Sequence, residues 1–174
     1  MQRCPVPTDL AIREAAADED RAIGEMLVQA YLAQHARKAL AIGMTPDREA
    51  ELRDQRARRA HAHILVAESG GRLAGTVALY PWGAPGSEAW IGGAANLRYL
   101  AVDPAFQGRG LSLLLLRHGE RIARQWMAPA ICLHVRSGAD GVIRLYRGQG
   151  YVRDPEGDLD FRPSIYLEAF RLSL

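Results

Sequence analysis

The segment Gln-Gly-Arg-Gly-Leu-Ser at residues 107–112 constrains this chain most strongly, because of the elements predicted on either side of it. Residues 97–102 have the pattern of a strand, and an apolar helical pattern starts at Leu111. Glycine permits backbone conformations that other residues resist, so successive N–H groups can turn toward one anion. The start of the following helix adds the positive end of its dipole. The segment therefore predicts a diphosphate site at a strand-to-helix junction.

Two familiar kinds of nucleotide-binding loop do not match this segment. The P-loop requires Gly-Lys-Ser/Thr at its end, and the dinucleotide fingerprint requires three glycines at the opening of a βαβ unit. This sequence lacks the lysine, and Ser112 stands at the third glycine position. Ordinary connections also contain paired glycines, so the turn alone leaves a phosphate site and a plain connection both open.

Two short motifs that follow one another along the chain point to one protein family. Gln107, Gly110 and Ser112 occupy the positions of a Gln/Arg-x-x-Gly-x-Gly/Ala signature after the strand residues 100–102. Residues 145–151 then match Leu-Tyr-x-x-x-Gly-Phe/Tyr. Over roughly residues 95–152, the chain resembles the GCN5-related N-acetyltransferase (GNAT) family. Ser112 departs from the more usual glycine or alanine, and its hydroxyl must fit beside the phosphate or donate to it.

The resemblance implies a fold of the α/β (α+β) class. The expected architecture is a mixed, mostly antiparallel central sheet with two splayed central parallel strands, flanked by helices. The length of 174 residues with 48% hydrophobic residues suits one domain, and we expect a single domain over 1–174.

Periodicity and turn residues predict the elements along the chain. Helices are expected from residue 18 onward, at 46–59 behind a Thr45 cap, from 111 to about 126, and at 140–148; strands at 10–14, 64–68, 73–80, 95–102, 130–135, 151–153 and 165–172. Adjacent glycines between the second and third strands predict a hairpin. Residues 81–93 hold prolines, glycines and two tryptophans, and they predict a loop that borders the acceptor site or merely covers the sheet edge. Residues 154–163 also have a loop pattern.

The chemistry that the resemblance implies is acetyl transfer from acetyl-coenzyme A to a primary amine, by direct attack on the thioester in a ternary complex. The diphosphate would be held by backbone amides near the signature, and the pantetheine arm by backbone amides of the preceding strand. The expected cofactor-binding residues are Leu100, Ala101, Val102, Gln107, Gly108, Arg109, Gly110, Leu111 and Ser112. An unpaired donor at the splayed strands would polarise the thioester carbonyl.

Two side chains are expected to serve the reaction itself. Tyr146 matches the family tyrosine that hydrogen-bonds the sulfur and protonates the departing thiolate, and a phenol is protonated at neutral pH. The position where many family members carry a basic carboxylate holds Asn96, whose amide can orient water or substrate but cannot take up a proton usefully. Proton removal would then run through ordered water or through Glu88. The alternative for Glu88 is that it is simply a charged side chain exposed to solvent.

Composition limits the partners. Lys and Arg number 22 against 20 Asp and Glu, so no large basic field argues for nucleic acid. Cys4 and Cys132 are too few for a disulfide framework, and the sequence shows neither a secretion pattern nor a membrane-spanning run. We expect a cytoplasmic protein. His61 and His63 alone do not make a metal site, so no metal is expected.

Two functional classes stay open at the level of sequence. The first is an enzyme acting on a small-molecule or peptide amine; the second is a catalytically silent acyl-coenzyme A-binding module for sensing or partner contact. The loops around 33–45 and 81–93 would select the acceptor. An arginine-rich helix at 46–59 and the tryptophans could support a homodimer, yet a monomer explains them equally well.

Overall fold

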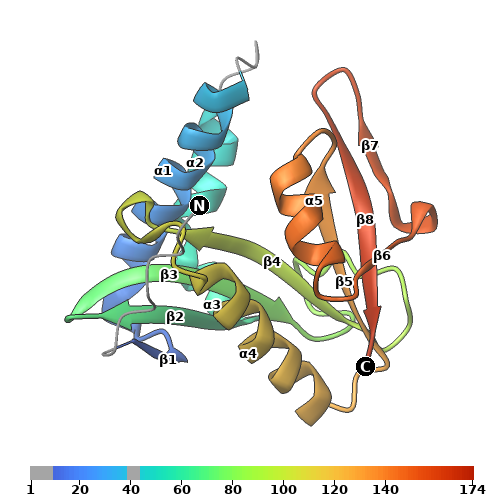
Figure 1. Cartoon of the computed structure of the whole chain (residues 1–174), viewed down its shortest axis with the longest axis horizontal. Coiled ribbons are helices and arrows are strands. Elements are labelled where there is room, and N and C mark those ends of the chain that lie inside the picture. Colours follow the sequence, from blue (N-terminus) through green and yellow to red (C-terminus); the bar gives the residue numbers. More distant parts are fainter. Residues whose placement is uncertain (1–9, 39–43) are drawn as a thin grey trace. The chain divides into compact units, whose positions relative to one another are not determined.

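The computed structural model describes residues 10–38 and 44–174, without the side chains of residues 34–38 (Figure 1). The helices of this part are α1 (Asp20–Lys38), α2 (Pro46–Arg53), α3 (Gln55–Arg59), α4 (Leu111–Gln125) and α5 (Asp140–Arg147), with short 3₁₀ turns at Ala17–Glu19, Pro104–Phe106 and Pro155–Gly157. The strands are β1 (Ala11–Glu14), β2 (His63–Ser69), β3 (Arg72–Tyr80), β4 (Ala95–Val102), β5 (Ala130–Arg136), β6 (Val152–Arg153), β7 (Leu159–Phe161) and β8 (Ile165–Ser173).

The strands form one mixed sheet in the order β1-β2-β3-β4-β5-β8-β6, and β7 pairs with β8. The pairs β1/β2, β5/β8, β6/β8 and β7/β8 are antiparallel, whereas β4 and β5 run parallel. Parallel pairing joins Ala95 to Ile131 and Asn96 to Cys132, at the beginning of both strands. The expected fold, a mostly antiparallel sheet with a central parallel pair and flanking helices, is confirmed.

The chain divides into two units that pack mainly within themselves. The first comprises residues 1–78 and 99–118, and the second comprises residues 79–98 and 119–174. The boundary runs through β3, β4 and α4, so each unit holds part of all three elements. A single domain over 1–174 stays a prediction.

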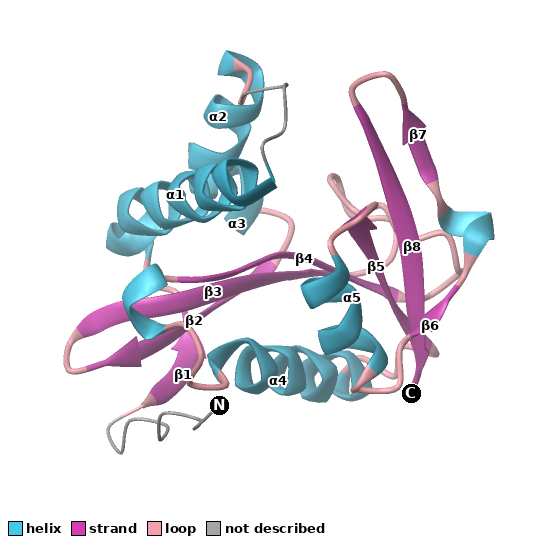
Figure 2. Cartoon of the chain, turned by 45° about the horizontal axis from the view of Figure 1, so that its top comes forward, coloured by secondary structure: helices cyan, strands magenta, loops and turns pink. Residues whose placement is uncertain are grey.

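In the first unit, helices cover both faces of the hairpin strands β2 and β3. Helices α1, α2 and α3 lie on one face, and the first turns of α4 lie on the other (Figure 2). The glycine pair predicted for the hairpin turn adopts positive φ angles of 59° and 71° at Gly70 and Gly71. On the α4 side, Gly75 allows close packing, since a Cβ there would lie 2.9 Å from the Leu115 side chain.

The helix expected over 46–59 is interrupted, so that part of the prediction is wrong. Thr45 caps α2 as expected, with its hydroxyl accepting the N–H of Arg48 at 3.2 Å. Asp54 leaves the helical conformation at ψ 71° and accepts the N–H of Ala57 at 3.0 Å. An aspartate competes for backbone donors in this way, and here it ends α2 and starts α3.

In the second unit, β8 is the central antiparallel strand. It pairs with β5 over seven residues, from Ala130↔Ser173 to Arg136↔Leu167, and its other neighbours are β6 and β7. Buried Leu133 and Phe170 belong to this pairing. Residues 154–163 were expected to be a loop, but they contain the short strand β7, which three alternating residues were too few to indicate.

Candidate active site

The segment after β4 is fixed by its own turn. The Asp103 N–H donates to the Ala74 carbonyl at 3.0 Å, and the Asp103 carboxylate accepts the N–H of Ala105 at 2.7 Å. Gly108 and Gly110 follow with φ angles of 78° and 80°, a left-handed backbone that favours glycine. A Cβ on either glycine would meet no atom within 4 Å, so the space beside the loop is open.

The amides of residues 108–112 form a row of available donors. In the described part of the chain, none of these five N–H groups donates a hydrogen bond; helical bonding begins with the Leu113 and Leu114 N–H groups, which reach the Gly110 carbonyl at 3.1 and 3.2 Å. The first amides of a helix lack partners by geometry, and the positive end of the α4 dipole lies here. The loop therefore presents a row of backbone N–H groups that could serve an anion.

Two side chains flank this row. The Gln107 amide donates to the Val102 carbonyl at 3.4 Å, which ties the loop back to β4. The Arg109 guanidinium lies 5.4 Å from the centre of the Phe106 ring and forms no ion pair with any described residue. Arg109 is thus a cation available to an anionic ligand beside the loop.

Strand β4 contains an unusual residue directly before Leu100, Ala101 and Val102. Tyr99 has φ 57°, a left-handed conformation that is rare and strained for an aromatic residue. The ring is held by the Arg58 guanidinium 3.8 Å above it, and the phenol donates to the carboxylate of Glu51. This local bend re-aims the backbone of β4 where cofactor contacts are expected.

Asn96 lies on β4 in the second unit and is fully buried. Its side-chain oxygen accepts the N–H of Glu88 at 2.8 Å, and its amide nitrogen donates to the Cys132 carbonyl at 3.0 Å. Both ends of the side chain are therefore engaged with main chain. Asn96 connects the loop of residues 81–93 to the first residues of β5.

Tyr146 lies near the C-terminal end of α5, also in the second unit. The residue is buried, its ring centre lies 5.4 Å from that of Tyr151, and its hydroxyl makes no hydrogen bond with any described residue. Burial raises the pKa of the Tyr146 phenol, which keeps it protonated. An uncommitted phenol of this kind can donate a hydrogen bond to a ligand.

Glu88 belongs to the loop of residues 81–93, which is irregular as expected. Its carboxylate pairs with Arg98 at 2.8 Å and lies 3.4 Å from Nδ1 of His134. His134 was missed in the sequence, where it is one polar residue within the apolar run at 130–135. A lone polar residue on a buried strand is a signal, but nothing in the sequence indicates its partner.

The cysteines and the potential metal ligands do not form a further site in the described part of the chain. Cys132 is fully buried and burial raises the pKa of its thiol, so it is not an activated nucleophile; Cys4 lies outside the described residues. Among described residues, no three His, Cys, Asp or Glu side chains gather closely enough to bind a metal. None of the helices described has the length and apolar character that crossing a bilayer requires.

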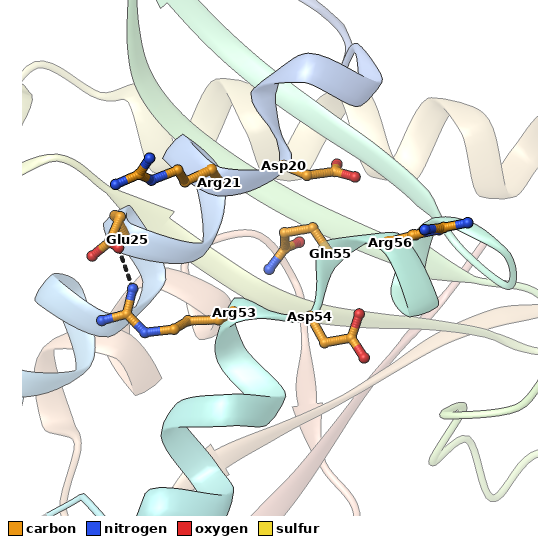
Figure 3. A pocket seen from close by; sticks show the side chains of 7 residues that line it. All are labelled: Asp20, Arg21, Glu25, Arg53, Asp54, Gln55 and Arg56. Atoms are coloured by element: carbon orange, nitrogen blue, oxygen red, sulfur yellow. Dashed lines mark hydrogen bonds and ion pairs between the residues drawn. The ribbon is translucent and has the colours of Figure 1, made fainter.

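A separate hollow of about 420 Å³ opens beside α1 and α3, and Figure 3 shows its charged lining. Its residues are Asp20, Arg21, Glu25, Arg53, Asp54, Gln55 and Arg56. Arg53 pairs with Glu25 across it, and the acidic and basic side chains balance in number. It contains none of the residues expected in the active site.

Comparison with known proteins decides the family. The model of the acetyltransferase (GNAT) family matches residues 22–151, which include the loop of residues 108–112, Asn96 and Tyr146. The chain belongs to the GNAT family. The resemblance drawn from the two sequence motifs is thereby confirmed.

Among GNAT-family relatives, N-alpha-acetyltransferase RimI of Mycobacterium tuberculosis is 35% identical over 94 residues. That match covers 53% of this chain and 54% of the relative, so the chain spans about half the length of the curated relative. Two solved structures share the fold. YncA of Salmonella typhimurium, solved with acetyl-CoA, has a TM-score of 0.68 at 24% identity, covering 96% of this chain and 95% of its own. Ribosomal-protein-alanine N-acetyltransferase of Brucella melitensis has a TM-score of 0.63 at 21% identity, covering 94% and 99%.

Proposed function

We propose that this GNAT-family protein is an N-acetyltransferase that moves the acetyl group of acetyl-CoA to a primary amine. The relative from M. tuberculosis is an N-alpha-acetyltransferase, and the Brucella neighbour is named for alanine of a ribosomal protein. These names favour a peptide α-amine as the first acceptor to test, with small-molecule amines as the second class. A cytoplasmic location and one domain over 1–174 are parts of the same proposal.

The observation that carries the proposal is the row of available amides at residues 108–112. Five backbone donors, open space at both glycines and the start of the 15-residue α4 fit a diphosphate, with Arg109 beside them. Backbone donors do not depend on side-chain identity, so Ser112 is compatible with binding. When bound, acetyl-CoA supplies this diphosphate and the activated acetyl thioester.

Strand β4 would bind the part of acetyl-CoA that lies beyond the diphosphate. We assign the backbone of Leu100, Ala101 and Val102 to the pantetheine arm, in line with the family resemblance. The left-handed Tyr99 turns the strand immediately before these residues. A backbone N–H freed by such a bend can donate to the thioester oxygen as negative charge develops on it.

Tyr146 would assist departure of the thiolate. Its phenol donates a hydrogen bond to sulfur while the carbon–sulfur bond breaks and the new carbon–nitrogen bond forms. A thiol has an ordinary pKa of about 8.5, and the pKa of the buried Tyr146 lies above the usual range of a phenol. Full proton transfer from the phenol is therefore uphill, so the thiolate leaves hydrogen-bonded to the phenol and takes its proton from solvent.

Release of free thiol in the presence of an amine tests the proposal directly. Incubation with acetyl-CoA and a panel of peptides with free N-termini should give acceptor-dependent thiol release, whereas the same peptides with blocked N-termini should give none. Mass spectrometry should locate one acetyl group on the amine.

The second candidate is a silent acyl-CoA-binding module, and the state of Asn96 favours it. Both ends of that amide are bonded to main chain, where an enzyme of this family would often place a base. Calorimetric measurement of acetyl-CoA affinity, together with the thiol-release assay, distinguishes the module from the enzyme. Affinity for acetyl-CoA without thiol release from any acceptor would support the module and contradict the enzyme.

A further inference from the structure

The reaction proposed above requires a group that removes a proton from the acceptor ammonium. An α-ammonium has an ordinary pKa of about 7.7–8.0 and a lysine ammonium of about 10.4, so much of either is protonated at neutral pH. Asn96 cannot take up that proton. The second unit nevertheless contains a buried imidazole in contact with a partly exposed carboxylate.

The tautomer of His134 follows from its surroundings. Its Nε2 lies 2.7 Å from the Gly157 carbonyl, and a carbonyl only accepts, so Nε2 carries hydrogen. In the neutral ring, Nδ1 then bears a lone pair. This Nδ1 is buried and makes no hydrogen bond with any described residue. It lies 3.4 Å from Oε2 of Glu88, and one proton between them would satisfy both atoms.

Trp90, Gly157 and Glu88 lie around the buried His134 ring. The Trp90 ring centre lies 5.3 Å from the imidazole, and the indole N–H is held by Asp154 at 3.0 Å. Gly157 packs against Trp90 so closely that a Cβ there would lie 2.2 Å from the indole. The His134 side chain is 6% exposed and that of Glu88 is 31% exposed, so Glu88 connects the buried ring to solvent.

The carboxylate is itself held in place. Arg98 binds Oε1 at 2.8 Å, and Asn96 accepts the backbone N–H of Glu88. Arg98 also donates to the Gly86 carbonyl, which ties the loop to β4. The charged groups facing the pair are thus Arg98 on β4, with Asp154 and its partner Arg171 behind Trp90.

We infer that Glu88 and His134 together form the proton acceptor of the reaction. Resting on the proposed function, this assigns contact with the acceptor ammonium to Glu88 and a positioning role to His134. The nitrogen–hydrogen bond of the ammonium breaks, its proton passes through the Glu88 carboxylate to Nδ1 of His134, and the amine keeps the electron pair for attack. The products of this step are a neutral amine and an imidazolium hydrogen-bonded to Glu88 and Gly157. Asn96 holds the main chain of Glu88 in place.

The test is a pH profile of kcat with saturating acetyl-CoA and peptide. Wild-type kcat should rise with pH and then level, because a base that is already protonated cannot accept the proton of the substrate. His134→Gln keeps a donor for the Gly157 carbonyl and removes the base. It and Glu88→Gln should each lower kcat at neutral pH by roughly 10²-fold or more, with the loss shrinking at high pH and KM for acetyl-CoA unchanged.

Matched controls are His61→Gln and Glu156→Gln, two exposed residues whose side chains have no partner among the described residues, and both should keep the wild-type profile. If His134→Gln and Glu88→Gln both kept the wild-type pH profile of kcat, the inference would be overturned and the proposed acetyl transfer would remain supported. Absence of acceptor-dependent thiol release from the wild type would instead overturn the proposed function, and the inference with it. If thermal melting shows that a variant does not fold, the ¹⁵N chemical shifts of the wild-type imidazole provide the test. We expect hydrogen on Nε2 and a lone pair on Nδ1 in the neutral ring, and hydrogen on Nδ1 would refute the pair.

Discussion

The loop proposed to bind the diphosphate and the residues proposed to move protons differ in the groups that they use. Residues 108–112 offer backbone amides within one short segment, whereas Glu88, Asn96, His134 and Tyr146 act through side chains from four separate segments. A backbone site requires only a local conformation, which two glycines provide. A side-chain site requires tertiary packing to bring its members together. The first is therefore tolerant of substitution and local, and the second is sensitive and distributed.

The largest expected effect is the loss of turnover when a side chain of the proposed site is changed. Tyr146→Phe removes the uncommitted hydroxyl and keeps the ring that packs on Tyr151. We expect kcat to fall by roughly 10²-fold or more, because general acids contribute 10²–10⁴-fold, while acetyl-CoA affinity changes little. Steady-state kinetics with calorimetry measures both quantities. Tyr151→Phe, which removes the neighbouring hydroxyl and keeps its ring, should retain turnover. An unchanged kcat in Tyr146→Phe would remove Tyr146 from the proposed role.

A smaller effect is expected when the backbone site is disturbed. Gly110→Val forces a β-branched residue to φ 80°, at a cost of about 1–3 kcal/mol, and the loop relaxes by turning its amides away. Acetyl-CoA affinity should fall by roughly 10- to 100-fold, since about 1.4 kcal/mol corresponds to tenfold. Gly92→Val is the matched control, because that glycine also faces open space but lacks a left-handed φ. Equal affinities in the two variants, measured by calorimetry, would show that the loop conformation does not matter for binding.

The smallest expected effect is on stability, and it concerns Asp158, the residue that follows Gly157 in the chain. Burial opposes ionisation of the adjacent Asp158, yet hydrogen bonds from Arg153, Tyr166 and the Ala169 N–H outweigh it and hold the pKa of that carboxyl below its ordinary value. The folded state therefore binds this proton more weakly than the unfolded state does. The resulting stability is present above about pH 4 and is lost as pH falls through the lowered pKa.

Asp158→Asn should accordingly lower the free energy of unfolding by about 2 kcal/mol at pH 7, with the difference shrinking toward pH 2. Urea unfolding at several pH values measures this. The control is Asp160→Asn, whose exposed carboxyl has its pKa lowered to about 2 by Arg162 alone. A loss in Asp158→Asn that does not depend on pH would refute the ionic origin of the stability.

Much of the fold could be predicted from local pattern. The β2–β3 hairpin, β4, α4 and α5 are each indicated by periodicity and by turn residues within their own segments. The break at Asp54 was not predicted, since a capping aspartate and a solvent-facing one have the same neighbours along the chain. Strand β7 was missed because its pairing with β8, and not its own three residues, makes it a strand.

The candidate site divides in the same way. The conformation of the loop at residues 107–112 could be predicted from the sequence alone, because two glycines, a preceding strand and a following helix are close in the chain and fix the backbone locally. The sequence also marked Tyr146 through a short motif. Tertiary structure alone decided that Asn96 is committed to main chain, that Tyr99 bends β4, and that the Glu88 carboxylate meets Nδ1 of His134. Those relations join residues up to 48 positions apart in the numbering, as in the contact of Tyr99 with Glu51, and only packing brings such residues together.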